Sequence, residues 1–471
     1  MKRVGNLYSS ITKFNNLLLA AKKAQRCKRL SKYSTYKPMF HTKFRWFATR
    51  FLTVLLTGLL AIVLGSCRAS LRTSAPDPQS LTLMGTITGK GIQDIQQTIA
   101  PFSDRSGIRI TYQGTDALTT LLPLQIAAGN PPDLALFPQP GLMGDLVAEQ
   151  ALIPLESLVD PQLLDNALTP QWRFLGKIGE HTYGLPVRAY LKGLVWYVPQ
   201  RFAEKGYEVP QSWAELEALT QQIIADGETP WCLGVESGEA SGWVGTDWVE
   251  DILLRQSGEE TYDRWVTHAI PFTDPAVANA FATFGHLVLN PKAVLGGKVG
   301  ILSTNYGDAP LGLFQDPPGC YLHTQANFIP AFFPEEVNRE AVDFFPLPGF
   351  TRAADASRLV VGAVQLGVLR DTPAVRSFLE YWLTPEPHKI WAGLGEHLSP
   401  YRDVAITDYP DRLSQKEAEI LKSADILRFD ASDAMPSAVG TGSFWAGMVD
   451  YLSGVELNTV LKDIDASWPR S

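Results

Sequence analysis

Residues 129–137, with the sequence GNPPDLALF, decide the fold, because one regular element ends there and another begins. A glycine, an asparagine and two prolines in succession terminate the helical pattern that runs over 117–128. Residues 133–137 then predict a short buried strand, since apolar residues follow the aspartate and a Pro-Gln-Pro-Gly run closes the segment.

The residues before this junction repeat the same alternation. A short strand is expected over 81–85, a helix over 92–102, where apolar residues recur at helical spacing, and a strand over 107–112. Strands and helices that alternate through short links are typical of an α/β fold with a largely parallel sheet.

The pattern changes beyond residue 186. We expect a strand over 194–198, a helix over 213–225 that Ser212 caps, and mostly helices up to about residue 340. Strands are predicted over 342–346 and 360–369, and Pro373 lies near the first turn of a further helix. The final third is mostly helical, and we find no internal repeat.

The N-terminus is strongly basic. Residues 1–66 contain 13 Lys or Arg and no Asp or Glu, and the mainly apolar run 51–64, with 14 residues, is too short for a membrane span of ~20 residues. This layout predicts a signal peptide, with an N-terminal anchor helix as the alternative. The leader is unusually long, and a start at Met39 would leave a conventional one.

The segment LGSC (64–67) resembles a bacterial lipobox. Cys67 would then become the lipid-modified mature N-terminus, anchored to the membrane by its acyl chains, with ordinary signal cleavage near the same position as the alternative. Residues 67–80 are rich in Ser and Pro and predict a flexible tether.

The chain after residue 66 is acidic, with 28 Lys or Arg against 49 Asp or Glu. Phosphate recognition needs clustered basic residues, so the composition argues against nucleic acid as a partner. Once Cys27 leaves with the leader and Cys67 takes lipid, Cys232 and Cys320 remain. An even pair in an oxidising compartment predicts a disulfide, and two separate buried thiols are the alternative.

Several short segments together resemble the extracellular solute-binding proteins of ABC sugar importers, the family that includes maltose-binding protein. Within it, the WC (231–232) and GC (319–320) segments favour the branch that binds α-glucosides and glucosylglycerol. The resemblance covers the chain from residue 81 onward, and the order of the segments is more specific than any one of them. The other segments are GNPPDLALF (129–137), YGLPVR (183–188), LVWY (194–197), PWCLGVES (230–237), GWVGTDW (242–248), QANF (325–328), LSP (398–400), FDASD (429–433) and GSFW (442–445).

The resemblance implies a two-lobed periplasmic-binding-protein fold of the Venus-flytrap type, with a hinge between the lobes and the ligand in the cleft. The chain would cross between lobes near Arg188, Phe344 and Ser399. Lobe one is then expected at 81–187 plus 349–397, and lobe two at 188–348 plus 398–471.

A sugar presents hydroxyls at its edge and C–H groups on its faces, so its site needs planar polar groups and aromatic surfaces. Phe137 and Gln139 follow a predicted strand, where ligands of parallel sheets bind. Arg188 offers a fork of donors near the first crossing, and an interlobe salt bridge is its alternative. Glu236 lies in a Gly- and Ser-rich loop, where a solvated acid is the alternative.

Trp243, Asp247 and Trp248 form the densest cluster of this chemistry, and we expect at least one of the two tryptophans to be core. His323 and Gln325 are expected in a loop after Cys320, where a histidine also serves in packing.

Trp445 matches a sugar-stacking tryptophan of the maltose-binding relatives, with core packing as its alternative. Phe444 should point elsewhere. Asp433 either bonds a hydroxyl or caps a helix.

The resemblance implies a substrate-binding lipoprotein on the periplasmic face of the plasma membrane. It would bind a small α-glucoside (glucosylglycerol, sucrose or trehalose), as a monomer without cofactor or metal, and deliver it to an ABC permease. Arg188 stands where maltose-binding relatives often carry an acid, which disfavours maltodextrin.

Three other functions are weighed. An exported glycoside hydrolase needs paired carboxylates, which Asp247, Glu250 and Asp251 supply on a predicted helix. A metal- or oxyanion-binding protein is disfavoured, because the seven His show no ligand spacing. A sensor that binds the same ligand but signals is not separable from a transport protein by sequence.

Overall fold

The computed structural model describes residues 79–115, 117–350, 357–395 and 397–469. The predicted signal peptide, Cys67 and nearly all of the tether lie outside these residues. Among the described residues, no helix combines the length and apolar character that crossing a bilayer requires.

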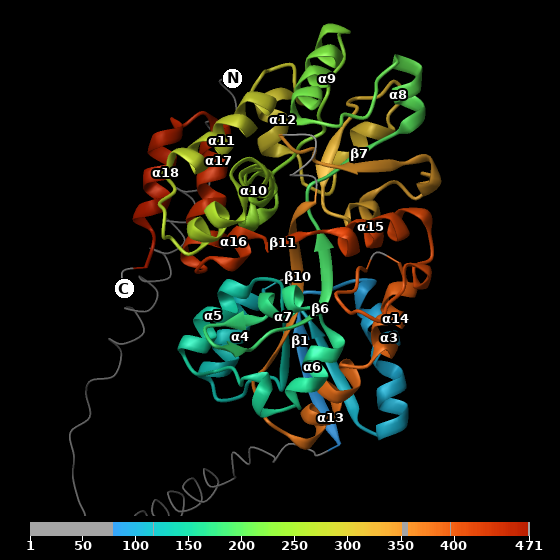
Figure 1. Cartoon of the computed structure of the whole chain (residues 1–471), viewed down its shortest axis with the longest axis vertical. Coiled ribbons are helices and arrows are strands. Elements are labelled where there is room, and N and C mark those ends of the chain that lie inside the picture. The colour runs from blue at the N-terminus through green and yellow to red at the C-terminus, as the bar shows by residue number, and fades with distance from the viewer. Residues whose placement is uncertain (1–78, 116, 351–356, 396, 470–471) are drawn as a thin grey trace, which may run out of the picture. The chain divides into compact units, whose positions relative to one another are not determined.

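A mixed sheet begins with the predicted alternation of strands and helices (Figure 1). Strand β1 (Ser80–Gly85) pairs in parallel with β2 (Arg109–Gly114) and with β3 (Leu134–Phe137). Helix α3 (Gly91–Ser106) lies between the first two strands in sequence, and α4 (Leu118–Ala127) precedes the third. The strand–helix alternation read from the sequence is therefore confirmed, with β1 starting one residue earlier.

Strand β10 (Arg358–Val368) completes this sheet and is the longest strand described. It runs antiparallel to β3 and to β6 (Leu185–Leu191), and parallel to β11 (Ile426–Phe429). All of its residues after Arg358 are buried, because neighbours flank it on both edges and helices cover it.

A second, three-stranded sheet has β7 (Leu194–Tyr197) at its centre. It pairs antiparallel with β8 (His323–Gln325) and with β9 (Asp343–Pro346). The expectation of a loop at His323 and Gln325 is wrong: this segment is a strand because its backbone pairs with Trp196 and its neighbours.

Helices pack beside this second sheet (Figure 1). Helix α9 (Trp213–Ala225) has the predicted bounds, and the side chain of Ser212 accepts a hydrogen bond from the backbone N–H of Glu215. Helix α10 (Trp243–Val266) is interrupted at Gly258, where φ is 80°. The other α-helices and the β4–β5 pair are α5 (Pro140–Ala148), α6 (Pro161–Ala167), α7 (Pro170–Leu175), β4 (Lys177–Ile178), β5 (His181–Thr182), α8 (Pro199–Lys205), α11 (Pro275–Val288), α12 (Gly297–Ser303), α13 (Pro373–Trp382), α14 (Pro385–Gly393), α15 (Arg412–Ser423), α16 (Ala431–Ala434), α17 (Trp445–Ser453) and α18 (Leu457–Ala466). The short 3-10 segments and one π-helical segment are η1 (Leu155–Ser157), η2 (Gly238–Ala240), η3 (Ala309–Phe314), η4 (Ile329–Phe332), η5 (Arg339–Ala341), η6 (Ile406–Asp408) and the π-helical η7 (Ala438–Phe444).

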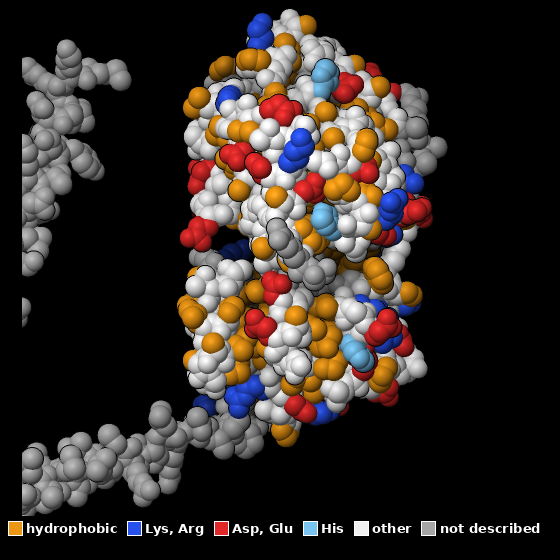
Figure 2. Space-filling model, turned by 90° about the vertical axis from the view of Figure 1, so that its left-hand side faces the viewer, with side chains coloured by type: hydrophobic (Ala, Val, Ile, Leu, Met, Phe, Trp, Pro, Cys, Tyr) orange, Lys and Arg blue, Asp and Glu red, His pale blue; other side chains and the backbone are white. Residues whose placement is uncertain are grey.

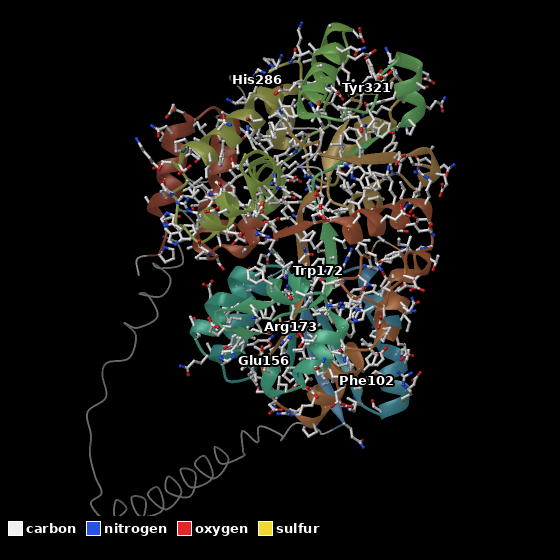
Figure 3. All side chains as sticks on the ribbon, in the orientation of Figure 1. Phe102, Glu156, Trp172, Arg173, His286 and Tyr321 are labelled. Atoms are coloured by element: carbon white, nitrogen blue, oxygen red, sulfur yellow. A yellow bond between two sulfur atoms is a disulfide. The ribbon has the colours of Figure 1, made fainter. Side chains whose placement is uncertain are left out.

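Two large hydrophobic clusters form most of the core. One contains Phe102 and surrounds the mixed sheet, and the other contains Tyr321 and joins the second sheet to α9, α10 and α11. Figure 3 shows these two residues in opposite parts of the view. The predicted disulfide between Cys232 and Cys320 is present, with their Cα atoms 5.5 Å apart. The predicted lobe boundaries stay a prediction.

Candidate ligand-binding site

A cavity of about 180 Å³ brings together side chains from four distant segments. We call it the Asp247 cavity. Five of its lining residues were predicted from the sequence, namely Gln139, Trp243, Asp247, Asp433 and Trp445. The others, Lys192, Ala240, Asp430 and Ser432, were not.

Strand ends position the polar side chains of this cavity. Lys192 directly follows β6 and its backbone N–H donates to the carbonyl of Val360, while Asp430 directly follows β11 and donates to the carbonyl of Val361. Strand β10 thus holds these two side chains side by side. Gln139 follows β3 in an extended conformation and opens α5 without capping it.

Lys192 and two carboxylates form a buried ion cluster. The Nζ atom of Lys192 lies 3.0 Å from Asp247 Oδ1, 2.8 Å from Asp247 Oδ2 and 2.8 Å from Asp430 Oδ2. Burial disfavours the charge of Lys192, but the two carboxylates outweigh it and hold its pKa well above the ordinary value. For Asp430, burial is likewise outweighed by Lys192, and its pKa falls to about 2.

Asp430 also organises the loop beside it. Its Oδ1 accepts hydrogen bonds from Ser432 Oγ at 2.8 Å and from the backbone N–H of Asp433 at 3.0 Å, which caps α16. The cap expected of Asp433 on the helix that carries Trp445 is not made, because Asp433 lies inside α16 and the N-cap positions of η7 and α17 are Ser437 and Phe444. Burial, together with the charge of Asp430, raises the pKa of Asp433 well above its ordinary value, against a hydrogen bond from Gln139.

Two indoles complete the cavity. The Nε1–H of Trp445 donates to Ser432 Oγ at 3.2 Å, and the ring of Trp243 lies 5.2 Å from Lys192 Nζ. Phe444 is fully buried in the second core cluster, as expected for a residue that points away from its neighbour. Carboxylates, an amide, an ammonium group and indoles are the groups that a polyhydroxylated ring needs.

Two further acids, Glu250 and Asp251, are buried near residues that line the cavity. Glu250 accepts hydrogen bonds from the backbone N–H groups of Ala431 at 2.6 Å and Ser432 at 3.1 Å, and Asp251 pairs with Arg255 at 2.7 Å. Both acids are fully buried and neither lines the cavity. The geometry therefore gives no support to a hydrolase that combines them with Asp247.

A larger cavity of about 750 Å³, which we call the Arg188 cavity, includes among its lining residues two aromatic side chains that pack near Trp243. Trp243 lines the Asp247 cavity, and the centre of its ring lies 5.2 Å from the ring centre of Tyr306 and 6.1 Å from that of Phe328. Tyr306 and Phe328 both line the Arg188 cavity. Arg188 lines this second cavity, with its guanidinium 4.7 Å from the ring centre of Tyr190. Figure 2 shows a hollow on one face of the molecule, with basic side chains visible inside it.

The remaining predicted site residues lie elsewhere. Phe137 is fully buried in the hydrophobic core. Trp248 is also buried, with its ring centre 5.1 Å from that of Trp231, so one of the two candidate tryptophans is a core residue as expected. His323 Nδ1 lies 2.8 Å from the carbonyl oxygen of Cys232.

Gln325 and Glu236 are engaged with protein groups. Gln325 Oε1 accepts from the backbone N–H of Ala326, and its side chain is buried beside Trp248 at a space of about 10 Å³. Glu236 accepts from Asn305 and from the backbone N–H of Gly238, each at 2.8 Å.

Lys192 is one of the four cavity-lining residues that sequence reasoning missed. A lysine directly after an apolar strand, followed by Gly193, is an unusual place for a charge and is the signal available in the sequence. Within the described ranges, no three His, Cys, Asp or Glu side chains are arranged to hold a metal ion.

Known proteins that resemble this chain identify its family. The model of the bacterial extracellular solute-binding protein family matches residues 87–389. The osmoprotective compounds-binding protein GgtB of Synechocystis sp. is 48% identical over 409 residues, which cover 87% of this chain and 97% of that protein. The alpha-glucosides-binding periplasmic protein AglE of Rhizobium meliloti is 42% identical over 398 residues, with 83% and 87% covered.

The crystal structure of the bacterial solute receptor AcbH matches with a TM-score of 0.70 at 19% identity, covering 82% of this chain and 97% of that one. The predicted α/β solute-binding fold of the maltose-binding type is thereby confirmed. The chain belongs to the family of bacterial extracellular solute-binding proteins.

Proposed function

We propose that this protein binds a small α-glucoside in the Asp247 cavity and delivers it to an ABC permease. Glucosylglycerol, sucrose and trehalose are the candidate ligands, since each presents a terminal α-glucose with a small polar partner. The names of two relatives, an osmoprotective compounds-binding protein and an alpha-glucosides-binding protein, support this class.

The observation that carries the proposal is the composition of the Asp247 cavity. Trp243 and Trp445 offer apolar ring surface, while Asp247, Asp433 and Gln139 offer acceptors and donors for hydroxyl groups. A volume of about 180 Å³ lies below the ~300–1,000 Å³ of drug-sized pockets, which suits one sugar ring.

Ligand access would depend on the separation of α5 from α16. Helix α5 follows Gln139, and Ser437, just after α16, donates a hydrogen bond to Asp145 of α5 at 2.7 Å. A ligand that contacts Gln139 on one side and Asp433 on the other would favour the state in which these helices touch. That state is the one we propose docks on the permease.

We further propose that the protein acts outside the cytoplasm, as a monomer, and that lipid on Cys67 anchors it. Metabolic labelling with a radioactive fatty acid tests the anchor. Label on the native chain and its loss in Cys67→Ser support it, whereas equal labelling of both chains contradicts it.

A thermal-shift screen of the purified full-length chain tests the ligand class. Ligand at 100 times its Kd should add about 2.7 kcal/mol of stability. The panel contains glucosylglycerol, sucrose, trehalose, maltose, amino acids and divalent metals. Stabilisation by the α-glucosides without release of free glucose is the expected result. Stabilisation only by an amino acid or a metal, or glucose release, would overturn the proposal.

A further inference from the structure

A short loop, residues 236–242, forms part of the Asp247 cavity, and we call it the Glu236 loop. Ala240 of η2 lines the cavity, and the loop ends directly before Trp243, the first residue of α10, which lines it too. Gly242 has a φ of 108°, and a Cβ there would lie 2.1 Å from the carbonyl oxygen of Trp445. The loop therefore bears on both indoles of the cavity, through the chain at Trp243 and through close packing at Trp445.

The side chain of Glu236 holds this loop at its start. Its Oε1 accepts a hydrogen bond from the backbone N–H of Gly238 at 2.8 Å, and its Oε2 accepts one from Asn305 Nδ2 at 2.8 Å. These hydrogen bonds, first the one from Asn305, hold the pKa of Glu236 below its ordinary value, so the group is ionised at neutral pH. With both oxygens engaged, the carboxylate has a fixed orientation.

Asn305 connects the Glu236 loop to the segment that carries Tyr306. Its Oδ1 accepts from the backbone N–H of Gly307 at 3.0 Å, which turns its Nδ2 toward Glu236. The two backbones pair as well, since the N–H of Tyr306 donates to the carbonyl oxygen of Glu236 at 3.0 Å. The ring centre of Tyr306 lies 5.2 Å from that of Trp243. Glu236 is thus placed where two segments meet whose aromatic rings are in contact.

We infer that Glu236 is a positioning residue of the ligand site: its carboxylate fixes the Glu236 loop against the Tyr306 segment, and so sets the place of the Trp243 ring, without touching the ligand. This inference rests on the proposed function for the identity of the ligand. Hydrogen bonds to an ionised group are stronger than those between neutral groups, so the carboxylate is suited to this task. Because a sugar face binds an indole by close contact, displacement of the ring lowers affinity.

Direct binding of the ligand by the Glu236 carboxylate is disfavoured by the geometry. Both of its oxygens already accept hydrogen bonds from the protein, and Glu236 lines neither the Asp247 cavity nor the Arg188 cavity. A direct contact would need a carboxylate at this position. A positioning role needs only that the hydrogen bonds to Gly238 and Asn305 persist, and this difference can be tested.

The test exchanges donor and acceptor across the hydrogen bond between Glu236 and Asn305. Glu236→Gln keeps one acceptor oxygen but turns an NH2 group toward that of Asn305, and Asn305→Asp places two carboxylates face to face. The double variant Glu236→Gln/Asn305→Asp reverses the hydrogen bond and keeps the net charge. It also keeps an acceptor for the N–H groups of Gly238 and Gly307.

Calorimetric titration of the full-length chain with glucosylglycerol measures affinity. Each single substitution should weaken binding about tenfold, because a hydrogen bond to a charged group is lost. The double variant should bind within about twofold of the native chain, since its hydrogen bonds are restored.

The position of Trp243 is measured without ligand, in protein labelled with fluorotryptophan. The fluorine NMR signal of Trp243, assigned with Trp243→Phe, should shift in each single variant and return in the double variant. The matched control is Glu456→Gln, because Glu456 also accepts from two backbone N–H groups, at 3.0 and 2.9 Å, but caps α18 and lines neither cavity. Glu456→Gln should leave the affinity and the Trp243 signal unchanged.

Three results would overturn this inference alone: unchanged affinity in Glu236→Gln, a loss of affinity that persists in the double variant, or a Trp243 signal that none of these variants moves. If the native chain binds no α-glucoside while the Trp243 signal shifts in the single variants and returns in the double variant, the proposed function is wrong and the positioning of Trp243 by Glu236 stands.

Discussion

The ammonium group of Lys192 and the carboxylate of Asp247 face each other at 2.8 Å, at the edge of a cavity where both are nearly buried. Asp430 contacts the same ammonium group at the same distance. The cluster fixes the orientation of Asp247 toward the cavity, so its integrity is a condition for the site.

Lys192→Met should destabilise the fold by about 3–5 kcal/mol at pH 7, because it leaves the buried Asp430 carboxylate without its cation. Urea unfolding followed by circular dichroism measures this loss. The matched control is Lys205→Met, which removes an exposed ion pair with Glu228 and should change stability little. Equal effects of the two substitutions would show that the buried cluster does not contribute as described.

Stability should fall as the pH drops from about 6.5 toward 3, owing to buried neutral histidines. Burial lowers the pKa of His388 to about 3, although a hydrogen bond with the carbonyl oxygen of Trp382 opposes the shift. Between the unfolded and folded pKa values the unfolded chain binds the additional proton, so the free energy of unfolding rises with pH in this window.

Melting temperatures measured from pH 7 to pH 4 test this for His388→Gln. The variant should lose part of the pH slope, whatever its stability at pH 7. His286, on the outward side of α11 (Figure 3), is the control, since its side chain is exposed and His286→Gln should keep the full slope. A slope that His388→Gln leaves unchanged would contradict the assignment.

Trp445→Ala should weaken α-glucoside binding by about 1–3 kcal/mol through lost ring contact and burial. Calorimetric titration measures the loss, and Trp468→Ala serves as the control, because Trp468 stacks on His268 and does not line the Asp247 cavity. Unchanged affinity in Trp445→Ala would remove this indole from the site.

Gly141→Ala should weaken ligand binding although Gly141 carries no side chain that touches the ligand. A Cβ at this position would lie 2.1 Å from the carbonyl oxygen of Met435, so α5 and the segment after α16 would have to separate. The ligand would then lose simultaneous contact with Gln139 and Asp433.

Gly144→Ala is the matched control on the same helix. A Cβ there meets no atom within 4 Å, so the substitution should stabilise α5 by about 0.5–1 kcal/mol and leave affinity unchanged. If both alanine variants bind as the native chain does, closure of α5 on α16 is not part of ligand binding.

The sequence predicted those parts of the fold where a local signal was strong. Ser212 followed by an amphipathic segment gave the bounds of α9, and the prolines after α4 placed the start of β3. Strand β8 was missed because three residues are too few for a periodic pattern, and it is a strand only through its pairing with β7.

Within the site, Trp445 and Asp247 were found because they lie in segments that resemble a known family. Lys192 was not, since its partners lie 55 and 238 residues away and no local pattern points to them. Trp243 and Trp248 lie in the same short segment, and the sequence does not distinguish their roles. The packing of α10 buries Trp248 and leaves Trp243 lining the Asp247 cavity.

The most direct test is a crystal structure of the protein grown with glucosylglycerol. We expect the glucose ring in the Asp247 cavity, in contact with Trp445 and within hydrogen-bond distance of Asp247 and Asp433. A ring bound elsewhere, with this cavity holding only water, would contradict this expectation.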